Sequence, residues 1–338
     1  MTPGALSEIC IEGDNVRSLA WDGDCLVDWV GGGQRYGIDG SIVKRRVYYA
    51  YEFDASIISS SGEYAAIFTS TGTKGLLLCN GEIVRQLNRD YYFANAYTYP
   101  IAFARLSDGR DVLVHCPDRY CQIEIEDVET GECLTKTDKR DSLDIFHSRL
   151  SVSTDGRWLM SAGWVWHPVD VVHLFDLRQA LRDPHSLDLA GLAPPVPWDV
   201  SSAAFVDKQT IAVATSDEFH GDDDDKSDHR PGKNQIAIWK IGASSCSGSV
   251  ALAHPPGTIM PISDRYVVSL FEHPRLIDVR EGVTVHAWGD IDSGKQISSV
   301  TWDSLPPPIA LDAKNARFAV AQEKTIRIIQ IDLKELGG

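Results

Sequence analysis

Residues 57–87 of the chain read IISSSGEYAAIFTSTGTKGLLLCNGEIVRQL. Four short apolar segments of strand length are separated here by polar stretches that contain Ser, Thr or Gly. These segments are Ile57-Ile58, Tyr64 to Thr69, Leu76 to Cys79 and Ile83 to Leu87. The last two are joined by Asn80-Gly81, a two-residue turn that needs positive φ and is typical of β-hairpins. The stretch therefore predicts a four-stranded antiparallel meander.

The same arrangement recurs along the whole chain. The turn after the first strand of each unit falls at Asp22-Gly23, Ser61-Gly62, Asp108-Gly109, Asp155-Gly156, Asp207-Lys208, Ser263-Asp264 and Lys314-Asn315. A spacing of roughly 40 to 50 residues with four short strands per unit is typical of propeller blades. The sequence therefore predicts an all-β fold, a single seven-bladed β-propeller of four-stranded antiparallel blades that occupies residues 1–338 as one domain.

The last unit lacks a fourth strand of its own. Its predicted strands lie around Ile309-Ala310, Arg317 to Ala321 and Thr325 to Ile331, after which the chain nearly ends. An alternating apolar segment, Ala5 to Ile11, precedes the first unit. We expect this N-terminal strand, at about residues 5–11, to complete the last blade and close the ring, because closure removes exposed strand edges.

Composition restricts the classes of partner. The chain has 338 residues, of which 43% are hydrophobic and 24% charged, as in a globular protein. Its 48 acidic and 32 basic residues give a net charge of -16, which repels nucleic acid and anionic membranes. Residues 1–12 contain no basic n-region, and no apolar run reaches about 18 residues. The seven cysteines are an odd number without a disulfide-framework spacing. We expect a cytoplasmic monomer with reduced thiols.

Three predicted third strands carry an aromatic or acidic residue near their ends. They are Val171 to Leu177 with Phe175-Asp176, Gln235 to Ile241 with Trp239-Lys240, and Thr325 to Asp332. On these residues the chain resembles a divergent WD-repeat protein over essentially its whole length. Trp-Asp pairs also occur at Trp21-Asp22, Trp198-Asp199 and Trp302-Asp303, near first strands, and a Gly-His dipeptide is absent. The resemblance implies a rigid disc that serves as a scaffold for other proteins.

In a propeller, the blade junctions and the loops between second and third strands gather on one face. Aromatic and Arg side chains on such a rim are typical of binding hot spots. The candidate partner-binding residues are Arg149, Trp164, Trp166, His167, Tyr49, Tyr92 and Trp198. Large aromatic side chains also fill the wedges between blades, so core packing is the alternative for any single Tyr or Trp.

The strongest break in composition is the predicted acidic loop 216–232, SDEFHGDDDDKSDHRPG. Its adjacent carboxylates, Asp222 to Asp225, repel one another, which favours a solvated extended loop. An acidic docking element is one alternative, and a metal site that uses His220 and His229 is another. The Asp alternation around a Gly that a calcium loop needs is missing.

Other chemical motifs are incomplete. Residues 289–296 read GDIDSGKQ, in which Gln296 stands where a phosphate-binding loop has its hydroxyl residue and Asp290 and Asp292 would face the phosphates. Cys116 and Cys121 have no second ligand pair for zinc. We therefore expect no metal and no cofactor.

Two classes of function follow from these observations. The first is a non-catalytic scaffold that presents its aromatic and Arg-rich face to a protein or peptide with basic surface. The second is an enzyme or small-ligand sensor with a site at the mouth of the central channel, built from His147, Arg149 and His167 among Trp164 and Trp166.

Overall fold

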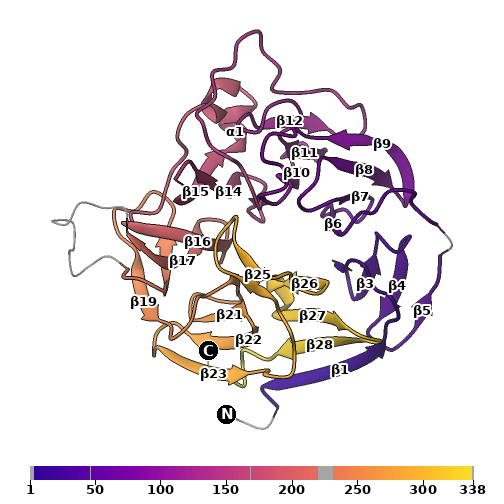
Figure 1. The fold of residues 1–338 in the computed structure, drawn as a ribbon, viewed down its shortest axis with the longest axis vertical. Helices are drawn as coiled ribbons and strands as arrows, with labels where there is room; N and C mark the ends of the chain where they lie inside the picture. Colours follow the sequence, from indigo (N-terminus) through magenta and orange to yellow (C-terminus); the bar gives the residue numbers. More distant parts are fainter. Residues whose placement is uncertain (1–3, 46, 168, 220–230, 337–338) are drawn as a thin grey trace.

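The computed structural model describes residues 4–45, 47–167, 169–219 and 231–336, and it confirms the seven-bladed β-propeller. Figure 1 looks down on the ring, in which the blades follow one another in chain order. All strand pairs within the blades are antiparallel meanders between neighbours in sequence, except at the closure of the ring.

Blades one, two, five and six each have four regular strands. In blade one these are β2 (Ala20–Asp22), β3 (Cys25–Asp28), β4 (Gln34–Gly37) and β5 (Ile42–Val43), and in blade two β6 (Ala55–Ile58), β7 (Tyr64–Phe68), β8 (Lys74–Cys79) and β9 (Glu82–Asn88). In blade five they are β16 (Trp198–Phe205), β17 (Thr210–Phe219), β18 (Gln235–Lys240) and β19 (Ser247–Ala251), and in blade six β20 (Thr258–Pro261), β21 (Tyr266–Phe271), β22 (His273–Asp278) and β23 (Val283–Ala287).

Blades three and four have three regular strands and a reduced fourth position. Their strands are β10 (Ile101–Arg105), β11 (Asp111–His115) and β12 (Glu124–Asp127), then β13 (Ser151–Val152), β14 (Trp158–Val165) and β15 (Val169–Asp176). The outermost position is held by isolated bridges, Glu126 with Cys133 and Leu174 with Leu192. After Leu192 the bridge cannot lengthen into a ladder, because Pro194 and Pro195 lack the backbone N–H groups that it would need.

The N-terminal strand closes the ring, as predicted. In blade seven, β26 (Ile309–Asp312), β27 (Arg317–Gln322) and β28 (Thr325–Ile331) are followed by β1 (Leu6–Glu12), which pairs with β28 from Leu6 opposite Ile331 to Glu12 opposite Thr325. Figure 1 shows β1 beside β28 at the rim.

One apolar cluster fills each of the seven interfaces between neighbouring blades. The interface of blades seven and one, for example, packs Ile11 and Ile326 against Leu26. The core is therefore a ring of wedges in which inner strands such as β21 are buried on both faces, and this explains their continuous apolar runs.

The turn of blade four shows how closely the blades approach. Gly156 has φ of +67°, and a Cβ placed on it would lie 2.2 Å from the carbonyl oxygen of Arg105 in blade three. Both the backbone angle and the contact require glycine at this position.

The predicted acidic loop starts later than expected. Residues 216–219 continue β17, where Phe219 pairs with Trp198 of β16. The hairpin of blade five therefore extends into the polar sequence that was expected to form the loop. Residues 220–230, with Asp222 to Asp225 and both histidines, lie outside the described residues.

In the residues that the structure describes, regular helix is confined to short pieces. They are α1 (Leu177–Ala180), capped by Asp176, and the 3-10 turns at Pro184–Leu187 and Ala313–Asn315. Within the described ranges, no helix combines the length and the apolar character needed to cross a membrane. All seven cysteines are free thiols.

Candidate functional site

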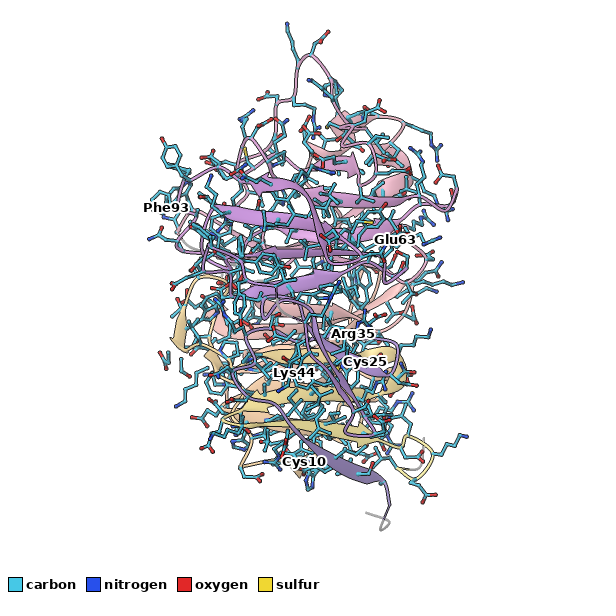
Figure 2. The ribbon with its side chains drawn as sticks, turned by 90° about the vertical axis from the view of Figure 1, so that its right-hand side faces the viewer. Cys10, Cys25, Arg35, Lys44, Glu63 and Phe93 are labelled. Atoms are coloured by element: carbon cyan, nitrogen blue, oxygen red, sulfur yellow. The ribbon has the colours of Figure 1, made fainter. Side chains whose placement is uncertain are left out.

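Three aromatic rings are exposed together on one face of the disc. Tyr92 and Phe93 lie in the connection from β9 to β10, and Trp166 follows the end of β14. Each of the three side chains is about two fifths exposed, at 39%, 43% and 40%. Figure 2, an edge-on view, shows Phe93 on the face opposite Glu63, which lies in the turn between β6 and β7. We call Tyr92, Phe93 and Trp166 the aromatic patch.

The rings of the aromatic patch contact one another edge to face. Their centroids are 4.8 Å apart for Tyr92 and Phe93, 5.1 Å for Phe93 and Trp166, and 6.5 Å for Tyr92 and Trp166. A cation held by ring faces sits within about 6 Å of each ring centroid, so a cage needs an open space between its rings. These rings fill that space themselves. The patch is therefore a cluster of packed rings rather than a cage.

A buried aromatic stack supports the patch from below. The rings of Phe146 and Trp164 lie 3.9 Å apart at an angle of 10°, and both side chains are buried. Trp166 packs edge-on against both rings, with centroids 5.4 Å from each. Buried side chains restrain the exposed rings, which reduces the entropy that they would lose on binding.

The backbone at the patch adopts conformations that are unfavourable for side chains larger than glycine. Phe93 has φ of +50° and His167, next to Trp166, has φ of +95°. The left-handed region costs a non-glycine residue on the order of 1–2 kcal/mol, and such residues cluster at functional sites. The fold thus tolerates local strain where it displays Phe93 and Trp166.

Carboxylates flank the patch. The exposed Asp144 accepts a hydrogen bond of 2.7 Å from the hydroxyl of Tyr120, whose ring lies 5.0 Å from that of Tyr92. Burial and this carboxylate both raise the pKa of Tyr120 above its ordinary value. Asp90 accepts a hydrogen bond of 2.9 Å from the backbone nitrogen of Tyr92. The surroundings of the patch therefore favour cations.

The structure brings together only some of the predicted binding residues. Tyr92 and Trp166 belong to the patch, and the exposed His167 adjoins it. Trp164 is 3% exposed, so the expectation that it forms part of the surface is wrong: its side chain packs inward from β14 under Trp166. Phe93 was missed, although a run of aromatic residues at 91–93 between two predicted strands could have signalled it.

The remaining predicted residues lie elsewhere. Tyr49 lines a separate groove of about 360 Å³ between the 48–53 segment and strands β8 and β9. Trp198 starts β16 and is partly buried. Arg149 faces the central channel. The seven residues therefore do not form a single surface.

A long connection between blades six and seven crosses the same face. We call residues 293–308 the strap; they include β24 (Lys295–Gln296), which pairs with β25 (Trp302–Ser304). Figure 1 places β25 near the centre of the ring. Val300 of the strap packs against the buried cluster that contains Phe146 and Trp164. The strap thus links the channel to the base of the aromatic patch.

The second predicted site, at the channel mouth, is not assembled as expected. Of His147, Arg149 and His167, only Arg149 lines the channel cavity. His147 is buried, with Nδ1 3.0 Å from Ser161 Oγ, and burial lowers its pKa to about 3. The imidazole of His147 is neutral and enclosed, whereas that of His167 is exposed on a loop. The two rings therefore do not converge on a substrate.

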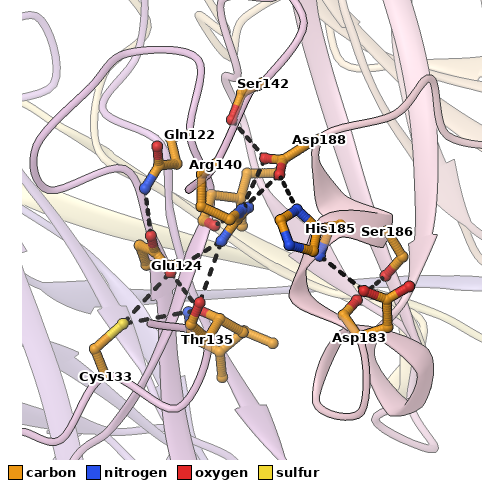
Figure 3. A network of polar contacts seen from close by, with 12 residues as sticks. Gln122, Glu124, Cys133, Thr135, Arg140, Ser142, Asp183, His185, Ser186 and Asp188 are labelled. Carbon is orange, nitrogen blue, oxygen red and sulfur yellow. Dashed lines mark hydrogen bonds and ion pairs between the residues drawn. The ribbon is translucent and has the colours of Figure 1, made fainter. Parts of the chain in front are cut away.

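A buried cluster of titratable groups between blades three and four is structural. In Figure 3, Arg140 donates to Asp188 from Nε, at 2.8 and 2.7 Å, and to Glu124 from Nη1, at 3.3 Å. Burial alone would raise the pKa of Asp188, but hydrogen bonds from Arg140 and Ser142 hold it below its ordinary value. Because these groups bind one another, they fix the connection between blades three and four rather than a ligand.

Within the part of the chain that the structure describes, no three His, Cys, Asp or Glu side chains are grouped so as to hold a metal ion. No protein-family model matches the chain, and no curated protein is detectably similar to it. The fold is therefore established by the structure, and the WD-repeat resemblance stays a prediction.

Proposed function

We propose that the protein is a non-catalytic interaction scaffold and that the aromatic patch binds a protein or peptide segment with basic side chains. The observation that carries this proposal is the exposure of Tyr92, Phe93 and Trp166 on a buried aromatic stack. The WD-repeat resemblance supports the same class of function by analogy of fold.

The shape and size of the patch suit a protein partner. Aromatic rings contribute large contact areas, and a ring at the centre of an interface contributes about 2 kcal/mol or more. Tyr91, which is 84% exposed, lies next to the patch and extends the surface. These rings leave no space between them for a small molecule, whereas their exposed surfaces can pack against an apolar surface of a partner.

Charge selects among partners. The net charge of -16 and the flanking carboxylates Asp90 and Asp144 attract Lys and Arg, which also stack on ring faces. We therefore propose a basic segment that contacts the rings with apolar or guanidinium groups. Its association should slow as salt is added, because salt screens electrostatic steering.

The test is affinity capture from an extract of the source cells with four versions of the chain. Trp166→Ala and Phe93→Ala each remove a ring of the patch, whereas Tyr48→Ala removes a ring that is 92% exposed elsewhere. We expect one protein to be retained by the wild type and by Tyr48→Ala and lost from both patch variants. Equal retention by all four folded proteins would contradict the proposal.

A further inference from the structure

The central channel contains a cavity of about 590 Å³. This is within the range of about 300–1,000 Å³ found for small-molecule sites. Residues at or just before the first strands of several blades line it, including Ser18, Ala55, Ser202 and Thr258, and the strap covers it with Leu305 and its neighbours. The cavity is separate from the aromatic patch, whose three residues are not among its lining.

Charge in this cavity is opposite to that of the molecule. Its charged lining residues are Arg17, Asp54 and Arg149, two cations and one carboxylate. The carboxylate of Asp54 is engaged by the backbone nitrogen and hydroxyl of Ser70, at 2.6 and 2.8 Å. Arg17 donates to the carbonyl oxygen of Phe53 at 2.9 Å. A low-dielectric concavity strengthens the remaining positive potential.

Arg149 forms no ion pair within 4 Å with a described residue. Its Nε donates to Ala162 O at 2.9 Å and its Nη1 to Ser201 O at 2.7 Å. No acceptor among the described residues meets Nη2. Burial lowers the pKa of Arg149, and the nearby Asp170 opposes that effect through space. One amino group of the guanidinium, Nη2, is therefore left without an acceptor in the described part of the chain.

Other polar atoms of the lining residues also lack a hydrogen-bond partner. Among the described residues, Ser56 Oγ, Ser293 Oγ and Trp302 Nε1 are buried without a hydrogen-bond partner. An indole nitrogen and a guanidinium can only donate, so the group that they lack is an acceptor. The rest of the wall is largely apolar, with Leu19, Leu270 and the three prolines of the strap.

We propose that the channel cavity binds a small organic monoanion, a carboxylate with an apolar body. The carboxylate lies towards Arg149 and the apolar body against the strap. This site does not depend on the aromatic patch and adds a ligand to the proposed scaffold.

Isothermal titration calorimetry with 4-phenylbutyrate tests the proposal. Its amide, 4-phenylbutyramide, has the same shape without the charge and serves as the matched probe. We expect the acid to bind the wild type about tenfold or more tighter than the amide, because charge-assisted hydrogen bonds are the stronger ones. Arg149→Gln should remove this difference, whereas Trp166→Ala should keep it.

A second pair of variants tests the site if Arg149→Gln fails to fold. Leu305 lines the cavity and is 70% exposed, so its substitution leaves the core intact. Leu305→Glu should weaken binding of the acid several-fold relative to Leu305→Gln, since the two differ only in charge. Equal affinity for acid and amide, or no saturable binding of the acid up to about 10 mM, would overturn the proposal. Capture of a protein by the patch would be unaffected by either result.

Discussion

Ser299 of the strap donates from its backbone nitrogen to both carboxylate oxygens of Asp170 in β15, at 3.0 Å each, across 129 residues of sequence. Its hydroxyl donates to the same carboxylate. The contact ties the connection between blades six and seven to blade four. Because Val300 follows Ser299 into the buried aromatic cluster, it also fixes the strap beneath the aromatic patch.

The carboxyl of Asp170 should make stability depend on pH. Burial raises its pKa from 3.8 to about 6, although Arg149 and the bonds from Ser299 act in the opposite direction and Asp199 adds to the rise. A folded-state pKa above the unfolded value means that the contribution to stability is full below about pH 4 and is lost as pH rises through about 6. A shift of about two units corresponds to about 3 kcal/mol.

Asp170→Asn isolates this effect. The difference in unfolding free energy between wild type and Asp170→Asn, measured in urea, should move in favour of the variant by up to about 3 kcal/mol between pH 4 and pH 7. Groups that titrate in both proteins cancel. A difference that is independent of pH would show that Asp170 is not perturbed.

The two tryptophans of the hairpin should behave differently. Trp164→Ala empties a buried position and should reduce the unfolding free energy by about 3–5 kcal/mol. Trp166→Ala removes a partly exposed ring and should reduce it by about 1 kcal/mol or less. Urea unfolding of the two variants measures both values. Equal destabilisation would mean that Trp166 belongs to the core.

The closing strand offers a similar pair. Ile11 is 6% exposed in the interface of blades seven and one, whereas Ile9, on the same strand, is 38% exposed. Ile11→Ala should cost about 3 kcal/mol and Ile9→Ala less than about 1 kcal/mol. Were the two costs alike in denaturant titrations, β1 would not be packed on blade one as the structure has it.

The buried ion-pair network should be sensitive to the loss of one partner. Arg140→Met leaves the carboxylates of Asp188 and Glu124 buried without a cation, which should cost about 3–5 kcal/mol. Arg110→Met removes an exposed partner of Asp108 and should change the stability far less, because water screens an exposed ion pair. Thermal unfolding of both variants gives the comparison. A mild effect of Arg140→Met would argue that water replaces the pair.

Local patterns in the sequence account for most of the fold. Glycine turns such as Gly62 and Gly156 indicate backbone angles, and the alternation in Ala5 to Ile11 indicates the two faces of a strand. Both properties depend on residues that are neighbours in the sequence. Blade number and ring closure could therefore be predicted. The reduced fourth strand of blade four also has a local signal in Pro194-Pro195.

The candidate site depends on contacts that leave no local pattern. Nothing near Asp170 indicates that Ser299 will reach it, because the strap crosses between blades that are remote in sequence. In the same way, Trp164 and Trp166 are two residues apart and chemically identical. Only the end of β14 between them decides that one packs inward and the other lies at the surface.

The most direct test of the scaffold function is the dissociation constant of the captured partner's basic segment, as a synthetic peptide, for wild type, Trp166→Ala and Tyr48→Ala. We predict that Trp166→Ala weakens binding by about thirtyfold or more, that Tyr48→Ala changes it less than about threefold, and that added salt weakens wild-type binding. Equal affinities for the three folded proteins would contradict the assignment of binding to the aromatic patch.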